Sequence, residues 1–275
     1  MTRPYAEVIG DPISHSKSPL IHNFWLGKLG IDAEYRACHV RPEELADYFA
    51  QRREDAEWRG CNVTIPHKVA ALEFVDEIEL LSGDAGATNC ILQSCGRFIA
   101  YNTDIDGVSE AVPWDKIPLC MIGAGGAARA VMPVLDFRCD TLSLRVVARD
   151  PAKAAQALDP RNDYGIEFHG FDEAAMAMHG AYGIINASPL GMSGQPPMPP
   201  QVLDGLRRTE PNAWVFDMVY APIETELLRV ARLEGRRTID GLVMLIGQAA
   251  AAFEKFFGQP APREHDVELR VLLTA

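Results

Sequence analysis

The sequence predicts an α/β fold with two domains, one of them of the Rossmann type. The chain has 275 residues, too many for one small core and about right for two domains. Short apolar strand patterns alternate with helical patterns along it, which is typical of α/β folds. The segment Cys120–Arg129 places a glycine-rich turn between a strand pattern and a helix pattern.

A dinucleotide-binding loop needs this strand–turn–helix context. The apolar run Pro118–Ile122 precedes the turn, and a helical pattern of small residues, Ala127–Leu135, follows it. Gly123 allows a tight turn, Gly125 lets the backbone approach a pyrophosphate, and Ala128 lets the helix pack on the strand. The helix N-terminus offers N–H groups and its positive dipole end to the phosphates. Glycine turns also end strands for purely structural reasons. The residues of the next strand are therefore needed to distinguish a dinucleotide-binding loop from a structural turn.

That next strand, predicted at Leu142–Ala148, ends at Arg149. An NAD site usually has an acidic residue there, whereas an arginine suits the 2′-phosphate of NADP. Lys153 would add a second positive charge. The alternative is that both side chains only cover a solvated loop. We expect a dinucleotide site that prefers NADP to NAD.

Composition excludes several classes of partner. Hydrophobic residues make up 48% of the chain and charged residues 23%, as in ordinary globular proteins. A net charge of -12 and a pI near 5.0 argue against nucleic acid or an anionic membrane as partner. The N-terminus lacks a signal-peptide pattern and no apolar run reaches membrane length, so we expect a cytoplasmic protein. No two cysteines have C-x-x-C spacing, which predicts reduced core thiols and no metal site. The cysteines are residues 38, 61, 90, 95, 120 and 139.

Periodicity predicts the remaining elements. Strands are predicted at residues 6–9, 34–40, 60–65, 182–187, 213–217 and 237–239, with a hairpin formed by 87–92 and 97–101. Helices are predicted at residues 19–29, 42–53, 105–112, 224–234 and 241–257, and from Pro66 onward. The first helix would bury the stripe Ile21, Phe24, Trp25 and Leu29.

Hydroxyl groups are concentrated before the first helix. Ser14, Ser16 and Ser18 alternate there, with Ser18 at the predicted N-cap and Pro19 at the first helical position. Hydroxyl and N–H groups at a helix N-terminus can bind a carboxylate. A loop that only caps the helix is the alternative, and the residues alone favour neither.

Further polar residues follow predicted strands. Asn62 and Thr64 share one strand face, and Lys68 falls on the first turn of the helix predicted from Pro66. A positive charge is unfavourable there, which indicates a functional lysine, although most lysines are simply surface residues. The triplet Asn102–Asp104 follows a strand, where ligand groups or an Asx-type cap occur. Gln248 on the last long helix is either solvated or a ligand donor.

Read in order, these motifs resemble the shikimate dehydrogenase family from end to end. Each motif is weakly specific, but their order and separations together are highly specific. The matching segments are residues 10–19 with His22 and Asn23, 62–66 with Lys68, 86–89, 102–104, 123–127, 186–192, 217–220 and 240–245.

The resemblance implies a discontinuous substrate domain, residues 1–104 and 238–275, with an NADP-binding Rossmann domain, residues 105–237, inserted and a cleft between the two. It implies an oxidoreductase that reversibly reduces 3-dehydroshikimate to shikimate with NADPH, in the chorismate pathway to aromatic amino acids. The expected partners are this small-molecule substrate and NADP, with no nucleic acid, membrane or metal. Both monomers and homodimers occur in the family.

The resemblance also implies residue roles. Lys68 and Asp104 would be the catalytic pair. Ser16, Ser18 and Tyr220 would bind the substrate carboxylate, while Asn62, Thr64, Asn89, Asp104 and Gln248 would hold the ring hydroxyls. Cofactor-binding residues would be Gly123, Ala124, Gly125, Gly126 and Ala127 at the pyrophosphate, Arg149 and Lys153 at the 2′-phosphate, and Ser188, Met218 and Gly241 on the nicotinamide side.

Some positions depart from the family pattern. Ala148 and Asp150 flank Arg149 where the family commonly has Asn and Thr, and Asp150 places a negative charge near the expected phosphate. Cys90 replaces a common threonine, and Asp106 is a second carboxylate close to Asp104. Two alternatives remain: a quinate/shikimate dehydrogenase with relaxed NAD/NADP use, and a non-catalytic NADP-binding sensor.

Overall fold

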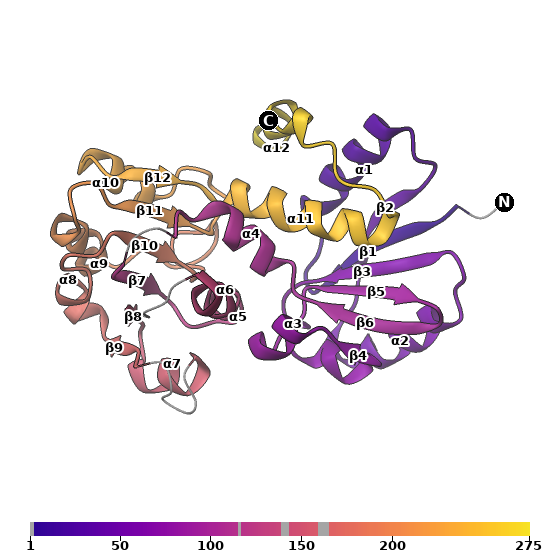
Figure 1. Ribbon diagram of the computed structural model, residues 1–275, viewed down its shortest axis with the longest axis horizontal. Coiled ribbons are helices and arrows are strands. Elements are labelled where there is room, and N and C mark those ends of the chain that lie inside the picture. The colour runs from indigo at the N-terminus through magenta and orange to yellow at the C-terminus, as the bar shows by residue number, and fades with distance from the viewer. Residues whose placement is uncertain (1–2, 115–116, 139–142, 159–164) are drawn as a thin grey trace. The chain divides into compact units, whose positions relative to one another are not determined.

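The computed structural model describes residues 3–114, 117–138, 143–158 and 165–275 (Figure 1). The chain forms two compact units, Met1–Asp106 with Ile246–Ala275, and Gly107–Leu245. Within the described residues, each unit contains one six-stranded sheet. The predicted α/β class is therefore confirmed.

The sheet of the first unit is mixed, in the order β2-β1-β3-β5-β6-β4. β1 lies between β2 and β3 and is parallel to both, and β5 and β6 form the antiparallel hairpin predicted from the sequence. The strands are β1 (Tyr5–Gly10), β2 (Glu34–His39), β3 (Trp58–Val63), β4 (Glu77–Ile78), β5 (Cys90–Ser94) and β6 (Arg97–Tyr101). The helices of this unit are α1 (Ser18–Leu29), α2 (Leu45–Arg53), α3 (Leu80–Ala85) and α12 (Asp266–Thr274), with 3-10 turns at Pro42–Glu44, Ala70–Phe74 and Arg263–His265. Helices α4 (Asp104–Ala111) and α11 (Gly241–Phe257) each have residues in both units.

Apolar side chains cover both faces of this sheet. One core joins the sheet to α2 through residues such as Phe49, Trp58 and Phe98. On α1 and α11, Trp25 and Phe253 pack edge to face with ring centroids 5.5 Å apart. This packing fixes α11, which carries Gln248, against the first unit.

The sheet of the second unit is entirely parallel, in the order β12-β11-β10-β7-β8-β9. This is the strand order of a Rossmann fold, whose ligands bind at the carboxyl ends of the strands. The strands are β7 (Leu119–Ile122), β8 (Leu144–Val147), β9 (Glu167–His169), β10 (Gly183–Asn186), β11 (Trp214–Asp217) and β12 (Arg237–Ile239).

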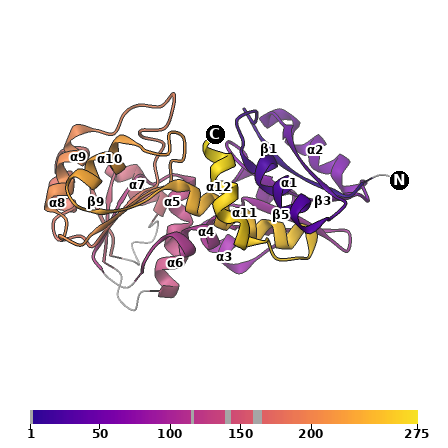
Figure 2. The same ribbon diagram turned by 90° about the horizontal axis from the view of Figure 1, so that it is seen from above.

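Helices α8, α9 and α10 share one core against this sheet and lie together in both views (Figures 1 and 2). The core includes Met178, Val202 and Leu227, packed against sheet residues such as Ile184 and Val215. The helices of this unit are α5 (Gly126–Arg129), α6 (Val131–Arg138), α7 (Pro151–Leu158), α8 (Ala174–Ala177), α9 (Pro200–Gly205) and α10 (Glu226–Leu233), with 3-10 turns at Phe171–Glu173 and Leu206–Arg208.

The helix predicted from Pro66 onward is wrong. Lys68 lies in a turn that leads into the 3-10 turn Ala70–Phe74. The carbonyl of Lys68 accepts the backbone N–H of Thr88 at 2.8 Å, so it is not available to continue a helix. The helix-terminus argument for Lys68 therefore fails, and its importance has to rest on its contacts.

Two details of α1 also differ from the prediction. Its N-cap is Lys17 and Ser18 is the first helical residue, while Gly30 ends the helix in a left-handed conformation. Leu29 is exposed, and the buried stripe includes His22 instead. The expectation of apolar stripes overlooked this histidine because it is polar.

The five cysteines described are free thiols, while Cys139 and the start of the strand predicted at Leu142 lie outside the described residues. Among the described helices none has the length and hydropathy to cross a bilayer.

Candidate active site

Lys68 and Asp104 form an ion pair in the first unit. Lys68 Nζ donates to Asp104 Oδ2 at 2.5 Å, and the two side chains are 22% and 9% exposed. Lys68 is held by the turn after β3, and Asp104 begins α4 directly after β6. The carboxylate of Asp104 is thus mostly buried, whereas the side chain of Lys68 is partly exposed.

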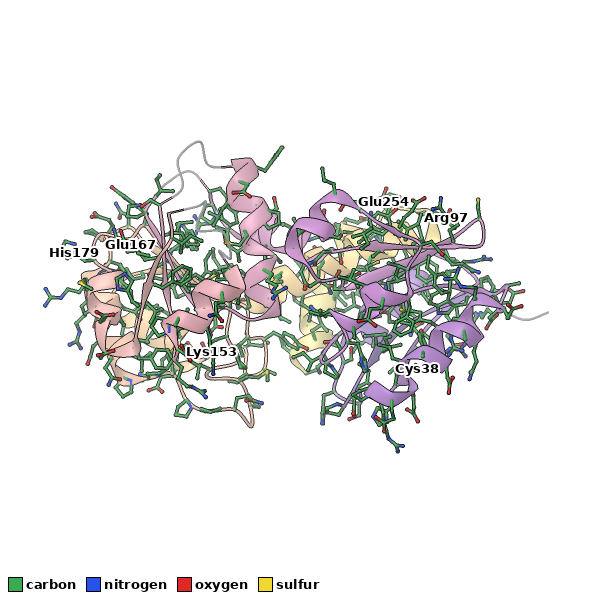
Figure 3. All side chains as sticks on the ribbon, turned by 90° about the horizontal axis from the view of Figure 1, so that it is seen from below. Cys38, Arg97, Lys153, Glu167, His179 and Glu254 are labelled. Atoms are coloured by element: carbon green, nitrogen blue, oxygen red, sulfur yellow. The ribbon has the colours of Figure 1, made fainter. Side chains whose placement is uncertain are left out.

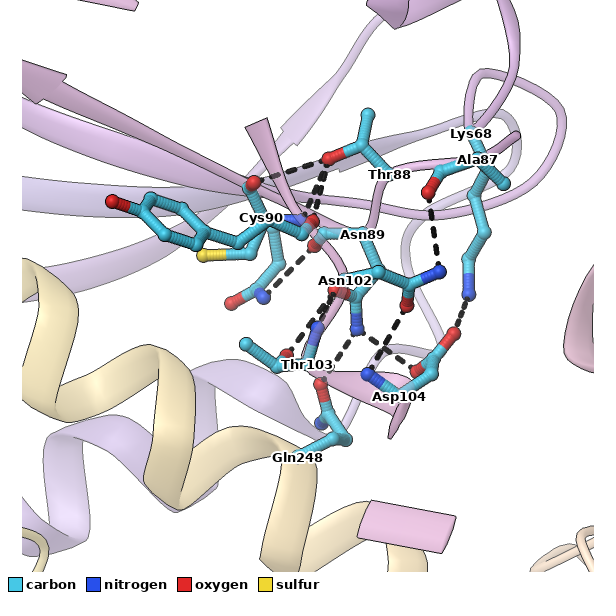
Figure 4. A network of polar contacts seen from close by, with 11 residues as sticks. Lys68, Ala87, Thr88, Asn89, Cys90, Asn102, Thr103, Asp104 and Gln248 are labelled. Atoms are coloured by element: carbon cyan, nitrogen blue, oxygen red, sulfur yellow. Dashed lines mark hydrogen bonds and ion pairs between the residues drawn. The ribbon is translucent and has the colours of Figure 1, made fainter. Parts of the chain in front are cut away.

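The amide of Asn89 fixes the carboxylate of Asp104 (Figure 4). Asn89 Nδ2 donates to Asp104 Oδ1 at 2.9 Å, and Asn89 Oδ1 accepts the backbone N–H of Thr103 at 2.7 Å. Since both ends of the amide are used, its orientation is set by the network. Asp104 thus receives donors on both oxygens, from Asn89 and from Lys68.

Asn102 shapes the loop that presents Asp104. Its Oδ1 accepts the backbone N–H of Asp104 at 3.2 Å, which is the Asx-type cap considered from the sequence. Its Nδ2 donates to the carbonyl of Ala87 at 3.1 Å, so the two ends of the β5–β6 hairpin are joined. The cap and the functional interpretation of the triplet Asn102–Asp104 are therefore compatible.

Asp106, the competing carboxylate, is an exposed residue that does not pair with Lys68. Lys68 pairs with Asp104 instead. Partial desolvation of the carboxyl group raises the pKa of Asp106 above its ordinary value.

Gln248 and Asn62 reach Asn89 from different elements. Gln248 on α11 is 9% exposed, and its Oε1 accepts from Asn89 Nδ2 at 3.4 Å, so it is buried rather than solvated. Asn62 on β3 donates to the carbonyl of Asn89 at 3.0 Å. Thr64, half-buried just beyond β3, packs beside Gly10, where an added Cβ would lie 2.5 Å from its methyl group.

The helix that follows the serine loop connects to the same network through Tyr35. The phenol of Tyr35 donates to Asn62 Oδ1 at 2.6 Å, and Asn23 Oδ1 on α1 accepts the backbone N–H of Tyr35 at 3.0 Å. Ser16 Oγ accepts the backbone N–H of Ser18 at 3.3 Å, which leaves its own O–H able to donate to a ligand.

In the second unit, the glycine loop between β7 and α5 leaves its backbone accessible. Gly123 follows β7 with φ +96, and a Cβ there would lie 2.8 Å from the Cβ of Ser188. A Cβ on Gly125 or Gly126 would meet no described atom within 4 Å, so the backbone before α5 is open to close approach. Ala128 is fully buried, as expected of the small residue that packs helix on strand. Ala124 and Ala127 complete the loop, which fits a dinucleotide phosphate.

Arg149 follows β8 and is exposed, as a 2′-phosphate ligand would need. Lys153 is exposed as well (Figure 3), but its Nζ lies 3.5 Å from Asp150 Oδ2. Asp150 Oδ1 accepts the backbone N–H of Lys153 at 3.1 Å, and this bond lowers the pKa of the carboxyl. Asp150 therefore caps α7, and its charge is partly offset by Lys153.

Ser188 and Met218 lie at the ends of neighbouring strands. Asn186 Oδ1 accepts both the N–H and the O–H of Ser188, at 3.1 and 2.7 Å. The N–H of Met218 donates to the carbonyl of Asn186 at 3.0 Å. A Cβ on Gly241 would lie 2.5 Å from the carbonyl oxygen of Met218, so only glycine allows this approach. Tyr220 is half-buried, and burial raises the pKa of its phenol.

Comparison with known proteins agrees with this geometry. Residues 8–91 match the model of the shikimate dehydrogenase substrate binding domain, and residues 241–267 match that of the shikimate 5'-dehydrogenase C-terminal domain. The shikimate dehydrogenase (NADP(+)) of Sphingopyxis alaskensis is 46% identical, over 99% of this chain and 97% of the relative. The chain belongs to the shikimate dehydrogenase family. The predicted family resemblance is thereby confirmed.

Two further similar proteins support the same family assignment. The shikimate dehydrogenase (NADP(+)) of Rhizobium meliloti is 41% identical, over 92% of this chain and 89% of the relative. The shikimate 5-dehydrogenase of Thermus thermophilus, whose crystal structure is in complex with NADP(H) and shikimate, is 31% identical. The match covers 98% of this chain and 99% of that chain, with a TM-score of 0.83.

Sequence reasoning missed several residues of these networks. Tyr35 lies in a strand, and its aromatic ring predicts a core residue rather than a polar contact. Asn186 and Asp217 were seen only as parts of family motifs. Their position at the ends of two predicted strands was the available signal, since parallel neighbours bring such ends together.

Proposed function

We propose that this protein is an NADP-dependent shikimate dehydrogenase that reversibly reduces 3-dehydroshikimate to shikimate. The Lys68–Asp104 pair, held by Asn89 within a network that also includes Gln248, is the observation that carries the proposal. A sensor of NADP would need the glycine loop but not this pair. The relatives named shikimate dehydrogenase (NADP(+)) support the same reaction and the same cofactor.

Bound NADPH supplies the hydride, and the chain supplies and positions the proton. Lys68 donates a proton to the carbonyl oxygen of 3-dehydroshikimate during reduction and takes it back during oxidation. Asp104 orients the ammonium group, since its Oδ2 lies 2.5 Å from Lys68 Nζ. Positioned acid–base groups of this kind contribute about 10² to 10⁴ in rate.

We further propose that the first unit holds the substrate through hydroxyl and amide side chains. Ser16 and Ser18 donate to the carboxylate, and Tyr220, which belongs to the second unit, assists. Asn62, Thr64, Asn89 and Gln248 face the ring hydroxyls, together with Asp104. Residues 1–104 and 238–275 are the substrate domain in this proposal.

Residues 105–237 form the NADP domain of the proposal. Gly123, Ala124, Gly125, Gly126 and Ala127 hold the pyrophosphate. Arg149 and Lys153 face the 2′-phosphate, and Ser188, Met218 and Gly241 face the nicotinamide. The loop geometry supports the first assignment, because Gly125 and Gly126 leave the backbone accessible among the described atoms.

The decisive experiment measures initial rates of nicotinamide reduction with shikimate, using NADP and NAD in parallel. Turnover that favours NADP supports both the reaction and the role of Arg149. Comparable turnover with NAD would keep the reaction but contradict the cofactor preference. An absence of turnover in protein that binds NADP would refute the proposed activity.

Two further proposals concern the surroundings of the enzyme. We propose that it acts in the cytoplasm, where its nicotinamide cofactor is available, and that it works as a monomer or a homodimer. Sedimentation of the purified protein distinguishes these two states.

A further inference from the structure

Asp217 is a fully buried carboxylate that the proposed chemistry does not use. It ends β11 and is paired in register with Asn186, which ends β10. Its Oδ1 accepts Asn186 Nδ2 at 2.8 Å and the backbone N–H of Val219 at 3.0 Å, and its Oδ2 accepts Thr225 Oγ at 2.6 Å. All three donors are neutral, although a buried carboxylate is expensive without a cation.

Each donor belongs to a segment with a defined task. Asn186 uses its other amide atom, Oδ1, to hold both the N–H and the O–H of Ser188. Val219 lies between Met218 and Tyr220, so its N–H fixes that segment directly. Thr225 Oγ also accepts the N–H of Leu228 at 3.3 Å, and thereby caps α10. One carboxylate thus joins the segments after β10 and β11 to the start of α10.

These segments have little room to move independently. Ser188 packs against Gly123, and the carbonyl of Met218 packs against Gly241, at distances that exclude a Cβ on either glycine. A shift of either segment would therefore displace a side chain that faces the cofactor in the proposed function.

We propose that Asp217 is a positioning residue that sets Ser188 and Met218 relative to each other and so holds the nicotinamide for hydride transfer. The inference rests on the proposed function, because that function assigns Ser188 and Met218 to the nicotinamide side. Burial raises the pKa of Asp217 to about 6, so the ionised carboxylate is disfavoured by its surroundings. Costly groups of this kind are typical of sites where function outweighs stability.

The test compares four variants with the wild type. Asp217→Asn keeps the size of the side chain but replaces one of its two acceptor oxygens with an NH₂ group. Thr225→Val removes the hydroxyl that donates to Asp217 Oδ2. Thr225→Ser restores that hydroxyl and is the conservative rescue. Thr209→Val is the matched control, because Thr209 is also a buried threonine of the second unit, whose Oγ donates to the carbonyl of Leu206 at 2.8 Å, outside the Asp217 network.

The measurements are kcat, the primary isotope effect with shikimate deuterated at the oxidised carbon, NADP affinity by calorimetry, and Tm. Asp217→Asn and Thr225→Val should each lower kcat by about tenfold or more, because small misplacements of reacting groups are costly. Their isotope effects should increase, since hydride transfer becomes slower than product release. NADP affinity should change by less than about threefold, because the phosphate contacts remain. Thr225→Ser and Thr209→Val should keep the wild-type kcat.

Two results would overturn the inference. One is an Asp217→Asn enzyme with wild-type kcat and isotope effect. The other is a loss of kcat that follows the loss of Tm equally in Thr225→Val and Thr209→Val, which would indicate a merely structural role. If the wild type itself does not oxidise shikimate, the proposed function fails and this inference fails with it. An active wild type supports the function whatever the variants do.

Discussion

Replacing Asp217 by Asn should change how the stability of the fold depends on pH. Burial raises the pKa of this carboxyl to about 6 in the folded protein, whereas an unfolded chain has about 3.9. Between these values the folded state holds a proton that the unfolded state has released. The free energy of unfolding therefore falls as pH rises from about 4 to about 6, and is unaffected by this group above that range.

The size of the effect follows from the two pKa values. A difference of about two units at about 1.4 kcal/mol per unit gives about 3 kcal/mol in total. About 2 kcal/mol of this lies between pH 4.5 and pH 7, where the assay is practical. The Asp217→Asn variant has no carboxyl to titrate at this position. Its free energy of unfolding minus that of the wild type should therefore increase by about 2 kcal/mol as pH rises from 4.5 to 7.

Urea unfolding at pH 4.5, 5.5 and 7 tests this, followed by tryptophan fluorescence because Trp214 is buried on β11. Other titrating groups cancel in the difference between the two proteins. Asp76→Asn is the control, because the N–H of Phe98 lowers the pKa of Asp76, and the stabilisation from that carboxyl is lost only below the unfolded pKa of about 3.9. The difference in unfolding free energy between Asp76→Asn and the wild type should therefore stay constant from pH 4.5 to pH 7. If the free energy of unfolding of Asp217→Asn minus that of the wild type stays constant with pH, the raised pKa of Asp217 is refuted.

Three more substitutions test the proposed site. Lys68→Ala should lower kcat by about 10³ while NADP affinity stays near the wild type, because only proton transfer is removed. Arg149→Ala should raise KM for NADP by about tenfold or more and leave KM for NAD unchanged, since a charged phosphate contact contributes about 1.5–3 kcal/mol. Gly123→Ala should lower both Tm and NADP affinity, because φ is +96 and the new Cβ would meet Ser188 at 2.8 Å.

Matched controls separate these effects from general damage. Lys28 pairs with Glu268 at 2.7 Å in the same unit as Lys68, so Lys28→Ala removes a comparable ion pair and should keep kcat. Gly125→Ala should lower NADP affinity with little loss of Tm, because no described atom lies within 4 Å of the added Cβ. An active Lys68→Ala enzyme, an unchanged NADP preference in Arg149→Ala, or a Gly123→Ala protein with wild-type Tm would each contradict the corresponding assignment.

Local patterns predicted the order of elements, but not contacts between distant segments. The hairpin β5–β6 and the glycine loop after β7 follow from turn residues and periodicity, which are properties of neighbouring residues. The helix expected from Pro66 failed because the carbonyl of Lys68 bonds to Thr88, twenty residues along the chain, and no local pattern encodes such a bond. The same limit hid the bond between Asn186 and Asp217, which depends on the register of β10 and β11.

The structure changes the expected contributions of Asp150 and Lys153 to the preference for NADP over NAD. From the sequence, Asp150 counted against NADP and Lys153 counted for it. In the structure the two residues engage each other, through a backbone bond of 3.1 Å and an ion pair of 3.5 Å at the start of α7. Their charges partly offset one another, and exposed pairs of this kind contribute little energy. Arg149 should therefore carry most of the preference for NADP, and Lys153→Ala should alter it far less than Arg149→Ala.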